Sequence, residues 1–350
     1  MLTERKDRVL RLIVDGYIES GAPVASMALA RDPRLTVSSA TIRNDMGSLE
    51  EDGYITRPHA SAGGVPADKG YRYFVEALST PPQPGARDLD AIRLALDHSR
   101  RDVEEWADAA AAILAGLLGT LAFVSPPKAE LSRVKQLELL QLQDFVVMLV
   151  VILHETAVLK QLISLQAPAT QEEVRRVRDR VVGMVAGKTA SEIASAAPDG
   201  GPELESLVLQ STVGALRERD APRSAGYALQ GIGRLLDQPE LNETGYGGAL
   251  MDSLADQETL PGLAARAPDD GSVAVVIGEE NPSEAFHRCS VVVCRYGIPR
   301  AASGVVGLIA PTRMEYRRAL PVVNAAASLL GGLVAETLPP ERPGESAAAT

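Results

Sequence analysis

Arg43 and Asn44 stand side by side in the segment SSATIRNDM, residues 38–46, whose other members are mostly small. An arginine guanidinium can form two hydrogen bonds with O6 and N7 of guanine, and an asparagine carboxamide can do the same with N6 and N7 of adenine. Three residues before them carry hydroxyl groups that can donate to phosphate oxygens: Ser38, Ser39 and Thr41. The chemistry that this spacing suggests is the reading of base edges in a major groove about 12 Å wide.

An ordinary solvated helix face is the alternative for these two side chains, and neighbouring residues decide between the two. On a helical wheel Ile42, Met46 and Leu49 share one narrow sector, which predicts that this side packs on the rest of the domain. Arg43 and Asn44 fall on the other side among small residues. A recognition helix normally enters the groove by its N-terminal half, where these two residues lie.

The elements around this helix predict a winged helix-turn-helix domain over residues 1–78. Thr3 is a suitable N-cap for a first helix, and Gly21 ends it. Ser38 is the N-cap candidate of the presumed reading helix, and Gly53 fits the position just after its end. The remaining expected elements are a short helix at 25–32, a strand at 54–58, a Gly-rich turn at 59–66, a second short strand and a helix at about 70–78.

Four further polar residues are predicted on or beside the hairpin that follows the reading helix. They are His59, Ser61, Lys69 and Arg72. In a winged helix, residues at such positions contact the phosphate backbone and fix the register of the protein on DNA. For His59 and Lys69, an ordinary polar turn is the alternative interpretation.

The charge of the chain is strongly acidic, with a formal net charge of −11 over 350 residues. Taken alone, this argues against a nucleic-acid partner, but the distribution of charge matters more than its sum. Residues 1–78 carry ten Lys and Arg against eleven Asp and Glu, so almost all of the acidity lies in residues 79–350. The candidate reading domain is therefore close to neutral.

Several classes of protein are excluded by composition and motif. The two cysteines, Cys289 and Cys294, have no histidine at ligand spacing, so we expect buried apolar thiols and no bound metal. The N-terminus is charged and the longest apolar run, at 145–153, is too short to span a bilayer, so we expect a cytoplasmic protein without membrane contact. No P-loop, nucleophile elbow or zinc-protease motif is present, so we expect neither an enzyme nor a cofactor.

Beyond residue 78 the pattern predicts an α+β domain interrupted by an insertion. A Pro-rich linker covers 79–87, and a disordered tail covers 339–350. The interrupted domain is expected at 88–197 and 271–338, and the insertion at 198–270, where the hydrophobic spacing is weaker. The expected strands are 134–143, 145–153, 157–165, 272–278, 289–296 and 302–310. The expected helices cover about 88–118, 170–186, 190–196 and 314–338.

At both ends, the sequence resembles the HrcA family of heat-inducible transcription repressors. The segments that carry the resemblance are LTERKDRVLRLIVDGYIESGAPVAS, VSSATIRNDMGSLEEDGYITRPHASAGGVPADKGYRYFVEAL, VVIGEEN, CSVVVCRYG and GVVGLIAPTRMEY. The resemblance implies a homodimer that binds double-stranded DNA at an inverted-repeat operator upstream of chaperone operons and releases it on heat shock. It also implies a GAF-like central domain that carries an inserted dimerisation domain, and dependence on the GroE chaperonin.

Three positions of the wing depart from the family pattern, namely Ala60, Gly64 and Ala67. The family usually has arginine where this chain has Gly64, so we hypothesise that the wing holds DNA less firmly than is typical. Two mechanisms of sensing stay open: thermal loss of the repressor's own fold, or a ligand in the central domain. The second would make the chain a metabolite-responsive winged-helix regulator with a polar pocket in 130–197 and 271–310, where the sequence shows no convergent cluster.

Overall fold

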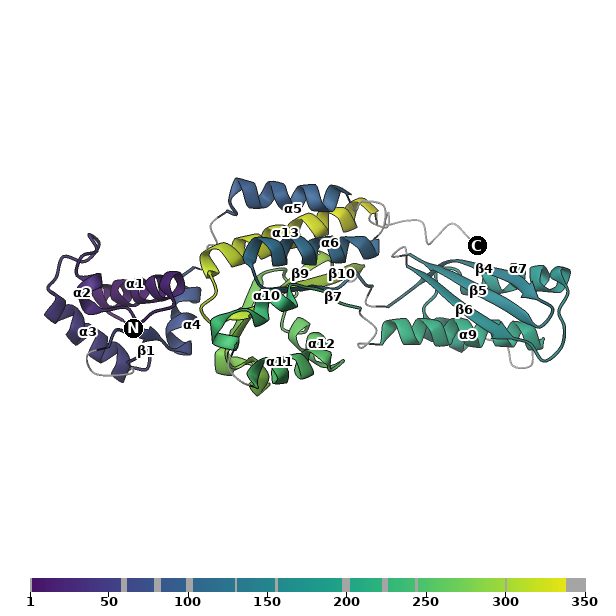
Figure 1. The fold of residues 1–350 in the computed structure, drawn as a ribbon. Helices are drawn as coiled ribbons and strands as arrows, with labels where there is room; N and C mark the ends of the chain where they lie inside the picture. The colour runs from purple at the N-terminus through teal and green to yellow at the C-terminus, as the bar shows by residue number, and fades with distance from the viewer. Residues whose placement is uncertain are drawn as a thin grey trace.

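The computed structural model describes residues 2–57, 62–78, 83–98, 103–129, 131–154, 157–196, 202–221, 226–242, 245–299 and 301–337. Figure 1 shows three regions in a row, with the N-terminal helices at one end, a helix-covered sheet in the middle and a second sheet at the far end. The predicted tail at 339–350 and the first part of the predicted linker, 79–82, lie outside the described residues.

The N-terminal region has the helices and strands of a winged helix-turn-helix domain in the predicted order. They are α1 (Glu4–Ser20), α2 (Ser26–Leu29), α3 (Ser39–Glu51), β1 (Ile55–Thr56), β2 (Val65–Pro66) and α4 (Asp68–Glu76). The predicted caps are confirmed, since Thr3 and Ser38 accept hydrogen bonds from backbone N–H groups of the first turns of α1 and α3. Gly21 and Gly53 adopt positive φ angles that favour glycine. The second strand begins earlier than predicted, within the Gly-rich turn.

The middle region, called here the central domain, is built on a five-stranded antiparallel sheet in the order β7-β3-β10-β9-β8. Its strands are β3 (Leu121–Val124), β7 (Ala228–Gln230), β8 (Val273–Ile277), β9 (Cys289–Ile298) and β10 (Ala302–Pro311). Three helices cover one face and three shorter ones the other (Figure 1). The first set is α5 (Ala86–His98), α6 (Val103–Leu118) and α13 (Tyr316–Thr337). The second set is α10 (Ile232–Leu236), α11 (Tyr246–Ala255) and α12 (Thr259–Ala264).

The far region, called here the inserted domain, has its own three-stranded antiparallel sheet in the order β4-β5-β6. Its elements are β4 (Val134–Gln143), β5 (Val146–Leu153), β6 (Val158–Ser164), α7 (Gln171–Val185), α8 (Ala190–Ala196) and α9 (Glu203–Asp220). The three helices share one hydrophobic core with one face of this sheet. The chain leaves the central sheet after β3 and returns in β7, the strand that pairs with β3.

The predicted boundaries of the insertion, 198–270, are therefore wrong. The strands at 134–164 form a separate sheet instead of joining the central one, so the insertion begins about 65 residues earlier than expected. The segment 228–267 packs on the central sheet and belongs to it. The alternation of apolar residues predicts a strand but not the sheet that it joins. The helix α9 was missed because its apolar residues are diluted by polar ones.

The two cysteines and the long apolar helix α13 both lie largely in the protein interior. Cys289 and Cys294 are both free and buried in β9, as predicted. Burial raises the pKa of the Cys289 thiol to about 12 and that of Cys294 to about 11, so both stay protonated at neutral pH. Among the described helices, α13 is long and apolar enough to cross a membrane, but 61% of its apolar window is buried inside the protein, where it packs on β9 and β10.

Candidate nucleic-acid interface

The helix α3 is held in place by the face that sequence spacing predicted. Ile42, Met46 and Leu49 are almost completely buried and pack in the core that α3 shares with α1. Arg43 and Asn44 are exposed on the other side. Neither forms a hydrogen bond or an ion pair with any residue that the structure describes. Both side chains are thus available to an external partner.

Asp45 is a second anchor of α3, and sequence reasoning missed it. Its carboxylate is buried and accepts two hydrogen bonds from Arg5 of α1, 2.6 Å from Nε and 2.9 Å from Nη2. Lys6 adds a bond from Nζ to Ser48 Oγ at 2.5 Å. The signal was present in the spacing, because Asp45 lies three residues after Ile42 and hence within the buried sector. A buried carboxylate needs a cation, and α1 supplies it.

The hydroxyl groups at the start of α3 mainly cap the helix. The Ser38 hydroxyl accepts a hydrogen bond from the Thr41 N–H at 3.2 Å, and the hydroxyls of Ser38 and Thr41 lie 3.0 Å apart. Ser38 is exposed, while Ser39 and Thr41 are half-buried. All three lie at the positive end of the helix dipole, where an anion is favoured. Their role as phosphate contacts stays a prediction.

A shallow hollow lies beside Arg43, with a volume of about 160 Å³. Its lining combines α2, α3 and the two ends of the wing: Ala25, Ser26, Met27, Arg43, Met46, Arg57 and Ala62. Met27 of α2 is 61% exposed, which is unusual for a large apolar side chain. The acidic C-terminal end of α3 is partly neutralised, because Arg57 donates to the Glu50 carboxylate. The hollow therefore presents apolar and cationic groups together.

Two of the four residues predicted beside the hairpin have protein partners. Lys69 Nζ donates to the Asp52 carbonyl oxygen at 2.7 Å and lies 4.5 Å from the centre of the Tyr54 ring. Arg72 donates from Nε to Glu280 at 2.7 Å and from Nη2 to the Val275 carbonyl oxygen at 2.7 Å. Both residues lie in α4, directly after the hairpin. Arg72 is bound to a carboxylate, and we remove it from the predicted DNA contacts. Lys69 is exposed and its hydrogen-bond acceptor is an uncharged carbonyl group, so its phosphate contact stays a prediction. His59 and Ser61 lie outside the described residues.

The hypothesis about Gly64 is also corrected. Gly64 is buried, and its backbone pairs with Val24 through two hydrogen bonds of 2.9 Å. A Cβ atom at this position would lie 3.1 Å from Ile55 Cδ1 and 3.2 Å from Met46 Cε. A side chain here would therefore enter the core of the domain. The absence of arginine at position 64 does not remove a DNA contact in this structure.

A metal site and a ligand cavity are the alternative functional sites, and the described residues support neither as well as the face of α3. No group of three or more His, Cys, Asp and Glu that could hold a metal occurs among the described residues. A cavity of about 740 Å³ lies where the central sheet meets the inserted domain. Its charged groups have protein partners: Arg295 pairs with Asp269, Lys128 donates to the Ala221 carbonyl oxygen, and Asp220 accepts from the Ser132 N–H. The cavity thus shows no convergent set of unpaired polar groups.

The fold and the exposed face of α3 define a helix-turn-helix transcription regulator with an α+β C-terminal region. Residues 33–67 match the family model of the DeoR-like helix-turn-helix domain, and residues 104–320 match that of the HrcA protein C terminal domain. The chain belongs to the HrcA family of heat-inducible transcription repressors, which are not enzymes.

Curated relatives agree with this assignment, and one solved structure shares the fold. The heat-inducible transcription repressor HrcA of Dehalococcoides mccartyi is 36% identical over 96% of this chain and 97% of its own. That of Roseiflexus castenholzii is 34% identical over 96% and 95%. A crystal structure described as a hypothetical protein at 2.2 Å resolution has a TM-score of 0.65 and 24% identity, covering 96% of this chain and all of its own, and shares the fold.

Proposed function

We propose that this repressor binds an inverted-repeat operator upstream of chaperone operons as a homodimer and releases it on heat shock. The observation that carries the proposal is the exposure of Arg43 and Asn44 on a helix whose opposite face is fully packed. Arg43 would pair with a guanine and Asn44 with an adenine in the major groove. Ser38, Ser39 and Thr41 would contact phosphates from the N-terminus of α3.

The wing supplies the remaining proposed contacts. His59 and Ser61 keep their place in the proposal as phosphate contacts. Met27 of α2 is added, because it is exposed and lines the hollow beside Arg43. Arg57 lines the same hollow but is not added, because Glu50 binds its guanidinium. Arg72 is left out, since the Glu280 carboxylate binds its cation. Lys69 keeps its place as a phosphate contact, because it is exposed and retains its charge. The proposed contact surface therefore differs from the predicted one by the loss of Arg72 and the gain of Met27.

We propose the inserted domain as the dimerisation domain, and the central domain as GAF-like. Helices α7–α9 cover one face of the β4-β5-β6 sheet, while no described residue covers the other. In β5, residues 147, 149, 151 and 153 are buried, whereas the alternate residues are only half-buried. A sheet with one covered face normally has polar residues on the other. Here large apolar residues occur on that face as well, beside a row that includes Glu138 and Lys160.

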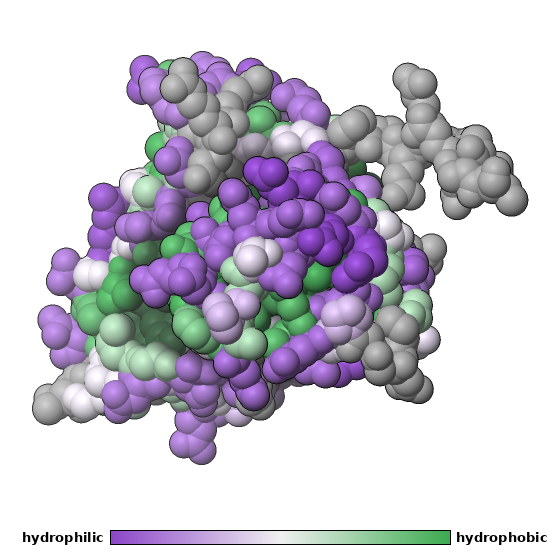
Figure 2. Space-filling model, turned by 90° about the vertical axis from the view of Figure 1, so that its right-hand side faces the viewer, coloured by the Kyte–Doolittle hydropathy of each residue, from purple (hydrophilic) through white to green (hydrophobic). Residues whose placement is uncertain are grey.

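One row across this open face illustrates the point. Leu140 of β4 pairs with Met148 of β5, and Met148 pairs with Leu162 of β6. Leu140 is 50% exposed and Leu162 is 61% exposed. Figure 2 views the chain from this end and shows hydrophobic residues in green among the hydrophilic ones. An open apolar face of this kind is typical of an interface, and a second copy of the chain would cover it symmetrically.

Such a dimer would explain recognition of an inverted repeat. Two copies of α3 about 34–36 Å apart, or a multiple of that distance, read two half-sites related by a two-fold axis. One arm alone would bind weakly, because linking two arms raises the affinity by a factor on the order of 100 or more. Heat that separates the dimer, or that unfolds it, would therefore release the operator.

The GroE chaperonin is the proposed modulator of activity. Chaperones act on chains that expose hydrophobic surface before assembly is complete. A monomer of this repressor would expose the open face of the β4-β5-β6 sheet, whereas the dimer would cover it. The chaperonin would thus assist the monomer and leave the dimer to bind DNA, in the cytoplasm.

A mobility-shift assay tests the proposal. The protein is titrated onto an inverted-repeat operator, onto a single half-site and onto random DNA, with and without the chaperonin. We expect one dimer on the inverted repeat, with an affinity well above that for the half-site, and loss of the complex at heat-shock temperature. Equal binding to all three DNAs would contradict the proposal. A stable apo protein that releases DNA only with a small molecule would favour a metabolite-responsive regulator.

A further inference from the structure

Two segments of the sequence whose contacting residues, Arg72 and Glu280, are 208 positions apart meet at the boundary between the DNA-binding and central domains. One is DKGYRY at the start of α4, and the other is GEEN, which follows β8 in the short 3-10 helix η3 (Gly278–Glu280). Arg72 donates two hydrogen bonds to the Glu280 carboxylate and a third to the Val275 carbonyl oxygen. Asp68 accepts a hydrogen bond from the Glu279 N–H at 2.9 Å. Each segment therefore both donates hydrogen bonds to the other and accepts them from it.

The GEEN turn is shaped in advance to receive α4. The buried carboxamide of Asn281 donates to the carbonyl oxygens of Gly278, Phe286 and Cys289, which fixes the turn from inside. Glu280 also accepts from the Ile277 N–H at 2.8 Å. Gly278 has a φ of 51°, and a Cβ atom there would lie 1.9 Å from Asp68 Oδ2. Any residue other than glycine would therefore displace the Asp68 carboxylate from the Glu279 N–H.

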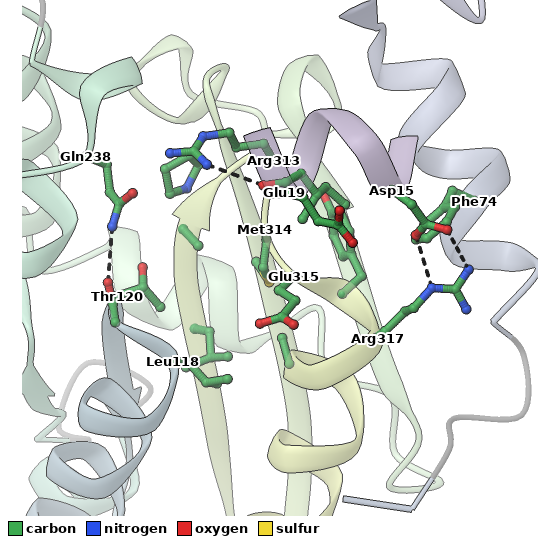
Figure 3. A pocket seen from close by; sticks show the side chains of 17 residues that line it. Asp15, Glu19, Phe74, Leu118, Thr120, Gln238, Arg313, Met314, Glu315 and Arg317 are labelled. Carbon is green, nitrogen blue, oxygen red and sulfur yellow. Dashed lines mark hydrogen bonds and ion pairs between the residues drawn. The ribbon is translucent and has the colours of Figure 1, made fainter. Parts of the chain in front are cut away.

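A second contact lies on the other side of the same boundary. Arg317 of α13 donates to both carboxylate oxygens of Asp15 in α1, at 3.1 and 3.2 Å, and lies over the Phe74 ring (Figure 3). Tyr71 of α4 packs on Tyr316 of α13, with ring centres 6.0 Å apart, and both rings are buried. The Arg72–Glu280 and Arg317–Asp15 pairs, with the tyrosine contact between them, fix the orientation of the DNA-binding domain on the central domain. One contact alone would leave it free to rotate.

We propose that Arg72 is a positioning residue for operator recognition, which acts through Glu280 and does not touch DNA. The α4–GEEN contact, as we call it, sets the angle at which each α3 projects from the dimer, and hence the half-site spacing that the repressor accepts. This inference rests on the proposed function, because only a dimer has a spacing to set. The contact joins the DNA-binding domain to the domain from which the inserted domain emerges, so it lies on the path between the two reading helices.

The experiment compares Arg72→Ala and Glu280→Gln with the wild-type chain on three DNAs. These are a single half-site, the operator, and operators whose half-site spacing is changed by one or two base pairs. We expect unchanged half-site affinity for both variants, because α3 itself is untouched. We expect operator affinity to fall about tenfold or more, since the advantage of two linked arms depends on their geometry. The preference for one spacing should weaken in parallel.

Two controls separate positioning from other roles. Arg11→Ala removes an arginine whose partner, among the residues that the structure describes, is Asp7 of the same helix, and it should change neither affinity. The exchanged pair Arg72→Glu with Glu280→Arg should recover the spacing preference at least in part. Half-site binding also reports that each variant is folded.

Several outcomes would overturn the inference. Loss of half-site affinity in Arg72→Ala, together with a lower salt slope, would show a direct phosphate contact. Unchanged operator affinity and spacing preference in both variants would show that the α4–GEEN contact does not set the geometry. If the wild-type chain itself binds the operator no better than the half-site, the proposed dimer function fails, and this inference fails with it. If the wild-type dimer binds the operator better than the half-site, but both variants behave like the wild type, only the inference is overturned and the proposed function stands.

Discussion

The Asp45 carboxylate in α3 is bound by the guanidinium of Arg5 in α1, forty residues earlier, and its side chain is only 5% exposed. This pair, on the buried side of α3, holds the helix that presents Arg43 and Asn44. We expect Arg5→Ala to lower the free energy of unfolding more than the loss of a surface ion pair does, because it leaves a buried carboxylate without its charged donor. Arg8→Ala is the matched control. It removes an exposed i,i+4 pair with Glu4 and should cost about 0.5 kcal/mol or less. Urea titrations measure both, and equal losses would contradict the assigned role of Asp45.

Gly64→Arg should destabilise the DNA-binding domain and should not tighten DNA binding. A side chain at position 64 meets Ile55, Met46 and Ile13 within 3.5 Å, and overfilling a packed core costs about 1–3 kcal/mol or more. Thermal unfolding measures the loss. Ala62→Arg is the control, since Ala62 is only half-buried and lines the hollow beside Arg43. A stable Gly64→Arg variant with higher operator affinity and a steeper salt slope would restore the original hypothesis about the wing.

The contact between Glu280 and Arg72 should depend on pH. Burial opposes ionisation of Glu280, but the Arg72 guanidinium and the Ile277 N–H outweigh it and lower the pKa of the carboxyl below 4.5. A depressed pKa means that the stabilisation is present above 4.5 and is lost as pH falls through the folded-state value. We therefore expect the difference in melting temperature between wild type and Glu280→Gln to be largest at neutral pH and to shrink in acid. A difference that grows in acid would contradict this assignment.

Leu162→Lys should weaken the proposed dimer, because it places a charge on the apolar row of the open face of the β4-β5-β6 sheet. Leu94→Lys in α5 is a close control, since both leucines are 61% exposed and neither substitution fills a packed core. Sedimentation equilibrium measures the mass of each variant over a range of concentrations. We expect the dissociation constant to rise at least tenfold for Leu162→Lys and to stay constant for Leu94→Lys. Identical behaviour of the two variants would exclude this face as the interface.

Local structure was predictable from the sequence where one element decides it. The caps at Thr3 and Ser38, the buried sector of α3 and the strands β4, β5 and β6 all follow from spacing and residue type. The partner of each strand was not predictable, because alternation is the same in either sheet. That is why the insertion was placed at 198–270.

The candidate site shows the same limit. The exposure of Arg43 and Asn44 depends only on the period of one helix, so it could be predicted from the sequence alone. The partners of Lys69 and Arg72 depend on how α4 packs, and one of them, Glu280, lies 208 residues away. The cation of Arg72 near the predicted wing therefore looked like a DNA contact, although the Glu280 carboxylate binds it. The position of Gly64 beneath the wing was hidden for the same reason.

Arg43→Ala gives the most direct test of the central claim, which is that α3 reads the operator. Its affinity is measured for the operator, for every single base-pair change in one half-site, and for random DNA, with Arg34→Ala, an exposed arginine paired with Asp32, as the control. We predict a loss of about 1–3 kcal/mol on the operator, with discrimination lost at one base pair of each half-site and little change on random DNA. Equal losses on operator and random DNA would contradict the claim, because Arg43 would then contact only the phosphate backbone.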